Sequence, residues 1–197
     1  VNKCNFFAFN LIESWPKWEK KILNICGEKY SGKSHLSNIF KKKFNALKLN
    51  AHDLNNSHLK EFKVYENIIL DDFTENIDEN LMYTLFNIAD QDNKFILINS
   101  LKPINSMKFN LDDFSSRTKN CLLAQIENPD DELIFAILLK NFSDRQITIE
   151  KKLIDFIIKH IDRSYGKIHE FIYTIDEISL KKKKSIDFKI IKEALGD

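Results

Sequence analysis

Residues 27–34 read Gly-Glu-Lys-Tyr-Ser-Gly-Lys-Ser and match the pattern G-x-x-x-x-G-K-[ST] at every defined position. In this pattern the glycines let backbone N–H groups turn toward one anion, the lysine reaches terminal phosphates and the serine offers a hydroxyl to Mg²⁺. At this chain's composition a chance match is expected about once in a thousand such chains. The segment therefore predicts a nucleotide site. The residues expected to bind are Gly27, Glu28, Lys29, Tyr30, Ser31, Gly32, Lys33, Ser34 and His35, with Ser34 also a metal ligand.

Two carboxylates, Asp71 and Asp72, follow the apolar run 67–70, about 40 residues after this loop. In enzymes with such a loop, one carboxylate at a strand tip holds the water shell of the metal, and the next can polarise an attacking water. We therefore expect Asp71 to bind Mg²⁺ and Asp72 to act as general base or to position water. The alternatives are that Asp72 only helps solvate the metal, with negligible hydrolysis, or that the pair is an ordinary acidic turn.

Three further residues are candidates for the same chemistry. Asn99 ends an apolar run, and its amide is expected to orient water near the terminal phosphate; otherwise it would bond to a loop. Arg117 precedes the last apolar run, where a guanidinium can reach a nucleotide on a neighbouring subunit. Arg163 begins a late helical pattern, from which it can reach phosphates bound to its own chain. For each arginine the alternative is a surface ion pair of little worth.

Five short runs of apolar, strand-favouring residues are expected to form the sheet that positions these side chains. They are near-continuous rather than alternating, which is typical of strands buried on both faces of a parallel sheet. The runs are 22–26, 46–49, 67–70, 94–99 and 121–126, with helical patterns at 32–43, 54–62, 77–90 and 111–118. The sequence therefore predicts a doubly wound α/β domain over residues 1–128, a P-loop fold with helices on both faces of a five-stranded sheet.

The pattern changes after Pro129, where no strand-like run remains. Apolar residues recur at helical spacing over 130–142, 149–161, 164–180 and 187–195. Residues 129–197 are therefore expected to form a small all-helical lid domain.

The composition limits the remaining classes. The chain has 197 residues, of which 43% are hydrophobic, and a net charge of +1, so neither disorder nor a strongly electropositive nucleic-acid binder is indicated. Three widely spaced cysteines predict neither disulfides nor a zinc site and favour a reducing cytoplasm. No apolar run reaches the length of a membrane span. Because the chain begins with Val1, we expect that an N-terminal segment is missing.

Three motifs in this order carry a family resemblance: Gly-Lys-Ser-His-Leu at 32–36, Asp-Asp-Phe at 71–73 and Ser-Arg at 116–117. Together they resemble the AAA+ ATPases, and among them the DnaA-like branch. The segment from Leu11 to Trp18 and the sequence Asp-Arg-Ser-Tyr at 162–165 resemble the Hda subfamily of short DnaA paralogues, in its alphaproteobacterial form. Because the chain ends soon after the helical region, we expect it to lack the DNA-binding domain of DnaA.

This resemblance implies a regulator of chromosomal replication initiation. Such proteins bind ADP or ATP, associate with the sliding clamp of DNA polymerase III and promote hydrolysis of the ATP held by DnaA, the regulatory inactivation of DnaA. By the same resemblance Arg117 is the arginine finger, Arg163 is sensor 2, Asn99 belongs to the sensor-1 region, and Asp72 implies slow intrinsic turnover. The clamp-binding peptide is expected upstream of Val1. A homo-oligomer is possible, and DNA would be contacted only indirectly.

A second reading is a DnaA-like or helicase-loader-like ATPase that acts directly on DNA. The feature in its favour is the run of four lysines at 181–184. Four lysines alone give weak and salt-sensitive attraction, so the run is also typical of a solvated helix end. A P-loop kinase of small molecules is disfavoured, because the chain offers neither a recognisable acceptor site nor an arginine-rich lid.

Overall fold

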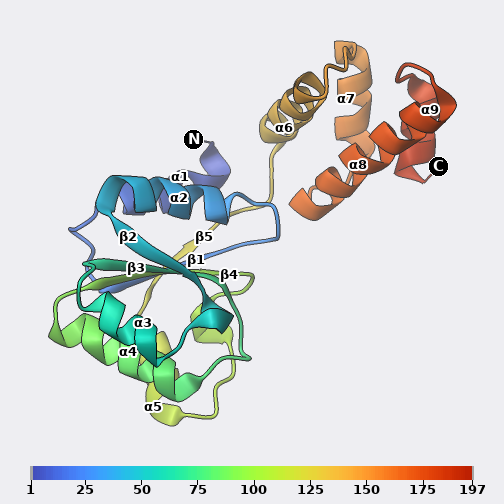
Figure 1. Cartoon of the computed structure of the whole chain (residues 1–197). Coiled ribbons are helices and arrows are strands. Elements are labelled where there is room, and N and C mark those ends of the chain that lie inside the picture. The colour runs from blue at the N-terminus through green and yellow to red at the C-terminus, as the bar shows by residue number, and fades with distance from the viewer. Residues whose placement is uncertain (1, 197) are drawn as a thin grey trace. The chain divides into compact units, whose positions relative to one another are not determined.

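The computed structural model describes residues 2–196. These residues divide into two compact units, Lys3–Glu127 and the residues from Asn128 onward (Figure 1). The first unit is built on a parallel sheet and the second consists of helices. No helix in the described part of the chain has the length and apolar character needed to cross a membrane.

The sheet of the first unit has five parallel strands in the order β2-β3-β4-β1-β5. The predicted α/β fold with a five-stranded parallel sheet is confirmed. Since β1 lies between β4 and β5, the loop that follows β1 begins at the carboxyl end of an interior strand of the sheet. The strands are β1 Ile22–Cys26, β2 Ala46–Asn50, β3 Asn67–Phe73, β4 Phe95–Ser100 and β5 Leu122–Gln125.

Helices cover both faces of this sheet (Figure 1). One face carries α1 (Lys3–Glu13) and α2 (Lys33–Phe44). The other carries α3 (Asn56–Phe62), α4 (Glu79–Gln91) and α5 (Asp112–Thr118). Two short 3₁₀ turns, η1 (Ala51–Asp53) and η2 (Ile104–Ser106), follow β2 and β4.

An aromatic cluster fixes the helix that begins at the phosphate loop. Trp18 stacks on Phe40 of α2 with ring centres 5.5 Å apart, and Trp15 lies 4.4 Å from the ring centre of Phe44. Phe95 of β4 makes edge contacts with both tryptophans. Because α2 is held to the sheet along this cluster, its first turn has a defined position relative to the strand ends.

Helix α1 and the end of strand β3 differ most from the prediction. Helix α1 was not expected, although Cys4, Ala8 and Ile12 are spaced by four residues and form its buried face. Strand β3 continues beyond residue 70 to Phe73, which is buried and pairs with Ser100 of β4 after an irregularity in the ladder. Both aspartates therefore lie within the strand rather than after it.

The second unit has a hydrophobic core of its own. Its helices are α6 (Asp131–Asp144), α7 (Lys151–His160), α8 (Tyr165–Lys182) and α9 (Phe188–Leu195). Fully or nearly fully buried side chains from these helices pack together, among them Ile134, Leu138, Phe142, Ile157 and Ile175. Side chains of Asp130, Ser164 and Asp187 cap the starts of α6, α8 and α9 by accepting backbone N–H groups.

Candidate nucleotide site

The loop between β1 and α2 depends on its two glycines for different reasons. A Cβ atom at Gly27 would lie 3.1 Å from the Cβ of Ile126 and 3.3 Å from its carbonyl oxygen, so a side chain here would require Ile126 to shift by a few tenths of an ångström. Gly32 has open space but a φ of 94°, which L residues rarely adopt. Helix α2 starts at the next residue and no side chain caps it. The N–H groups of its first turn therefore point toward a position suited to an anion.

The other loop residues differ in their exposure. Ser31 is buried, and its hydroxyl has no hydrogen-bond partner among the described residues. Lys29 and Tyr30 are exposed, with the ammonium of Lys29 5.3 Å from the centre of the Tyr30 ring. Ser34 and His35 are exposed in the first turn of α2.

Lys33 lies folded back over the loop. Its Nζ donates to the carbonyl oxygen of Gly27 at 2.7 Å and to that of Glu28 at 2.8 Å. Burial lowers the pKa of the Lys33 ammonium, and the charges of Asp71 and Asp72 oppose this effect. A polyphosphate would supply stronger, charge-assisted acceptors than these two neutral carbonyls.

The two aspartates at the end of β3 face different partners. The Oδ1 atom of Asp71 accepts from Asn99 at 3.0 Å and lies 3.4 Å from the hydroxyl of Ser34. The Oδ2 atom of Asp72 accepts instead from the amide of Asn50 at 3.3 Å. Asp72 has a φ of 53°, a conformation that costs a non-glycine residue about 1 kcal/mol or more. This turn separates the two carboxylates, so they have different neighbours.

Asn99 connects the strand end to α2. Its amide nitrogen donates both to Asp71 and, at 3.0 Å, to the hydroxyl of Ser37. The side-chain oxygen of Asn99, Oδ1, is buried and has no hydrogen-bond partner within residues 2–196. An unpaired buried acceptor is costly. A water molecule or ligand bound at this place would give the oxygen of Asn99 a donor and so explain why no protein group pairs with it.

The sequence analysis missed one charged residue of this site, Lys48 of β2. Its ammonium lies 2.9 Å from the Oδ2 atom of Asp71 and 2.9 Å from the side-chain oxygen of Asn38. The only trace in the sequence is a lysine between two leucines in an otherwise apolar run. The contact depends on the pairing of β2 with β3, in which Asn50 lies opposite Asp71.

The donor set fits a magnesium ion. Ser34 and Asp71 bring a hydroxyl and a carboxylate oxygen together, and hard oxygen ligands are those that Mg²⁺ prefers. The position at the end of β3 and the start of α2 matches that expected from the loop motif. Lys48 already occupies the second oxygen of the same carboxylate. Among the described residues there is no cluster of three or more His, Cys, Asp or Glu side chains suited to another metal.

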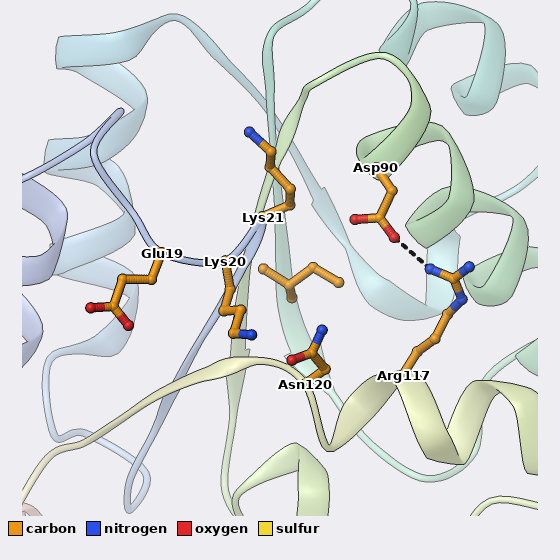
Figure 2. A pocket seen from close by; sticks show the side chains of 7 residues that line it. Glu19, Lys20, Lys21, Asp90, Arg117 and Asn120 are labelled. Atoms are coloured by element: carbon orange, nitrogen blue, oxygen red, sulfur yellow. Dashed lines mark hydrogen bonds and ion pairs between the residues drawn. The ribbon is translucent and has the colours of Figure 1, made fainter.

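Arg117 lies near the amino ends of the strands, whereas the phosphate loop lies at their carboxyl ends. It ends α5 just before the amino end of β5, and its guanidinium pairs with Asp90 of α4 at 2.5 Å. The guanidinium carbon also lies 5.3 Å from the ring centre of Tyr83. Figure 2 shows the pair at the wall of a pocket of about 300 Å³. The pocket is lined by Glu19, Lys20, Lys21, Ile22, Asp90, Arg117 and Asn120.

Arg163 lies in the helical unit, between α7 and α8. Its guanidinium is 2.9 Å from the carboxylate of Asp131 in α6, and both side chains are more than half exposed. An exposed pair of this kind contributes little to stability. Its predicted contact with phosphates stays a prediction. A third arginine, Arg145, lies 3.3 Å from Asp176 within the same unit.

Comparison with known sequences points to one kind of protein. No protein-family model matches the chain. In an alignment of 220 residues it is 24% identical to the chromosomal replication initiator protein DnaA of Helicobacter hepaticus, covering 99% of this chain and 48% of that protein. It is 29% identical over 123 residues to DnaA of Lachnoclostridium phytofermentans, covering 62% of this chain and 27% of that protein. The chain thus spans half the length of these relatives or less.

Comparison with solved structures defines the fold. Domain III of DnaA from Thermotoga maritima superposes with a TM-score of 0.76 at 18% identity, covering all of this chain and 93% of that one. The fold of this chain is therefore that of domain III of DnaA. A replication initiator DnaA bound to AMPPCP and single-stranded DNA has a TM-score of 0.68 at 20% identity, covering 93% and 66%. The RuvB branch migration motor of Thermotoga maritima is less similar, with a TM-score of 0.64 at 14% identity, covering 89% and 61%.

Proposed function

We propose that this chain is a DnaA-related AAA+ protein of replication initiation that binds ADP or ATP in the loop from Gly27 to Ser34. The observation that carries the proposal is the convergence of three elements: the uncapped start of α2, the ammonium of Lys33 beside it, and the Asp71–Asn99 pair at the ends of adjacent strands. The sequence similarity to DnaA and the AMPPCP-bound structural neighbour support the same ligand class.

In this proposal each residue of the site has a defined task. The backbone of the loop and the first turn of α2 hold the phosphates, and Lys33 exchanges its two loop carbonyls for phosphate oxygens. Ser34 and Asp71 would hold Mg²⁺, which supplies charge neutralisation on the phosphates. The unpaired oxygen of Asn99 is available to accept a hydrogen bond from water, and Asp72 is the candidate base.

The test of nucleotide binding is a calorimetric titration of ADP into the full chain and into Lys33→Met. Methionine keeps the length of the side chain but removes the charge. Loss of charge-assisted bonds should weaken binding by about 100-fold. Lys42→Met, a change of the same kind at an exposed position on α2, should bind as the unchanged chain does. Retained affinity in Lys33→Met would refute the proposal.

We further propose that the chain promotes hydrolysis of ATP held by DnaA, as the Hda type of regulator does. Arg117 supports this reading, because it lies across the sheet from its own phosphate loop and remains about one third exposed. A guanidinium in that position has access to a nucleotide on another subunit. In this scheme DnaA and the DNA-loaded sliding clamp are partners, and Arg163 senses the nucleotide bound to its own chain.

The experiment combines ATP-loaded DnaA, the clamp on DNA and this protein, and measures phosphate release. The protein should stimulate hydrolysis. The Arg117→Ala variant should lower the stimulated rate by about 1,000-fold, which is the lower part of the range known for arginine fingers. Arg145→Ala removes an arginine that pairs with Asp176 in the helical unit and should change little. Equal stimulation by the wild-type chain and Arg117→Ala would contradict the finger assignment.

A second candidate is an ATPase that acts directly on DNA, since one structural neighbour is bound to single-stranded DNA. Against it, Lys181 pairs with Glu177 and Lys182 with Glu193, so part of the lysine run is neutralised locally. We expect only weak binding of single-stranded DNA at near-physiological salt. Tight binding that is lost when the four lysines are changed to glutamine would favour the second candidate.

A further inference from the structure

Lys48 is placed against the candidate metal carboxylate by three oxygen atoms from two elements. Its ammonium contacts Asp71 and Asn38 at 2.9 Å each and lies 3.4 Å from the hydroxyl of Ser37. The side chains of Lys48 and Asp71 are 19% and 17% exposed, so solvent screens this pair less than an ordinary surface pair. Strand β3 and helix α2 together hold the lysine in place.

Both oxygens of the Asp71 carboxylate have partners within the chain itself. Asn99 donates to Oδ1, Ser34 lies near the same atom, and Lys48 occupies Oδ2. Burial raises the pKa of Asp71, but the hydrogen bonds from Lys48, Asn99 and Ser34 and the charge of Lys48 outweigh it and leave the pKa lowered. The chain thus stabilises the ionised carboxylate with its own cation.

A divalent cation bound at Ser34 and Asp71 would lie close to the positive charge of Lys48. The site holds two cations, Lys33 and Lys48, and two anions, Asp71 and Asp72, within one network. Mg²⁺ would either share Asp71 with Lys48, which brings like charges together in a partly desolvated place, or displace the lysine from its three acceptors. Both alternatives cost free energy that a site without this lysine would not require.

We propose that Lys48 is a built-in competitor of Mg²⁺, so that the nucleotide binds with little gain from the metal. This inference rests on the proposed nucleotide site and deepens it by assigning the residue that sets its dependence on metal. Lys48 acts through Asp71 and is a positioning residue. We therefore expect ADP to bind well without a metal, and free Mg²⁺ to change the occupancy of the nucleotide site only weakly.

The test is the affinity for ADP, measured by calorimetry in EDTA and across a series of MgCl₂ concentrations. In the wild-type chain saturating Mg²⁺ should strengthen ADP binding by less than about threefold. In Lys48→Met the gain from saturating Mg²⁺ should increase about tenfold, a usual size for coupled binding events. Lys48→Gln, which keeps a polar group beside Asp71, should give the same direction.

The matched control is Lys42→Met, which removes the same charge from an exposed part of α2 and should leave the wild-type dependence on Mg²⁺. An equal gain from Mg²⁺ in the wild-type chain and both Lys48 variants would overturn the inference. Absence of ADP binding in the wild-type chain under every condition would instead overturn the proposed nucleotide site, and the inference with it.

Discussion

Lys33 shows how a binding residue can oppose the stability of its own fold. Burial lowers the pKa of its ammonium, and the two nearby aspartates only oppose this effect. A lysine whose pKa is lower in the folded protein than in the unfolded chain destabilises the fold at every pH below the folded pKa. The penalty disappears as the pH rises past the pKa of the unfolded chain. At neutral pH the penalty is still present, because the ordinary pKa of a lysine lies well above 7.

This argument predicts that Lys33→Met is more stable than the wild-type chain when no nucleotide is present. We expect an increase in Tm of about 2 °C. At the same ADP concentration the Tm should rise more in the wild-type chain than in Lys33→Met, because the variant is expected to bind ADP about 100-fold more weakly. Differential scanning fluorimetry at neutral pH measures both effects. A lower Tm in the ligand-free variant would show that the bonds to the two loop carbonyls outweigh the burial of charge.

At the same scale, the site residues differ in how well the sequence predicts their positions. Lys33 and Ser34 follow from the loop motif, and Asp71 and Asn99 from their place at the ends of apolar runs, because parallel strands end at one edge of a sheet. The structure brings these four together. Lys48 has no such marker. Its contact depends on strand pairing and on the side of β2 that faces α2, neither of which a local pattern determines.

Among the elements, the predicted strands lie at the expected places because each is a short apolar run between polar segments. Helix α1 was missed because its sequence is rich in phenylalanine and asparagine, so its face of residues 4, 8 and 12 is not distinct in the pattern. Phe6 and Phe7 are more than half exposed, which further weakens the amphipathic contrast. The irregular end of β3 was also beyond prediction, since it depends on the pairing of Phe73 with Ser100.

Helix α6 offers a test of how its first turn is stabilised. The side chain of Asp130 accepts the N–H of Leu133 at 2.8 Å. Asp130→Ala leaves that donor without its cap and should lower the free energy of unfolding by about 1 kcal/mol. Urea unfolding followed by circular dichroism measures the change. Lys140→Ala, at an exposed position later in the same helix, should have an effect of less than about 0.5 kcal/mol; equal effects would argue against the cap.

For the whole molecule, the main feature is that each of the two units buries hydrophobic side chains of its own. In the first unit these include Phe62, Phe86 and Phe114, which join α3, α4 and α5 to the sheet; in the second they lie among α6 to α9. Both tryptophans, Trp15 and Trp18, belong to the first unit. Tryptophan fluorescence therefore reports on the sheet unit, whereas helical circular dichroism reports on both units.

This division predicts that Ile157→Ala acts on one unit. Ile157 is fully buried in the helical core, and its truncation should cost about 2–5 kcal/mol there. The urea midpoint measured by circular dichroism should fall, while the midpoint measured by tryptophan fluorescence should stay the same. Two-state unfolding is not expected of a chain with two cores. Coincident shifts in both signals would show that the units unfold as one.

The placement of the phosphate loop and Arg117 at opposite ends of the strands gives the sheet unit a polarity. A five-residue strand is about 17 Å long, so the arginine of one copy cannot serve the nucleotide of the same copy. Any row in which each arginine meets the next nucleotide runs head to tail, with unlike surfaces at its two ends. The first member then lacks a donor for its nucleotide and the last has an idle arginine. If Arg117 acts as the proposed arginine finger, the order of the molecules in such a row decides which nucleotide is hydrolysed.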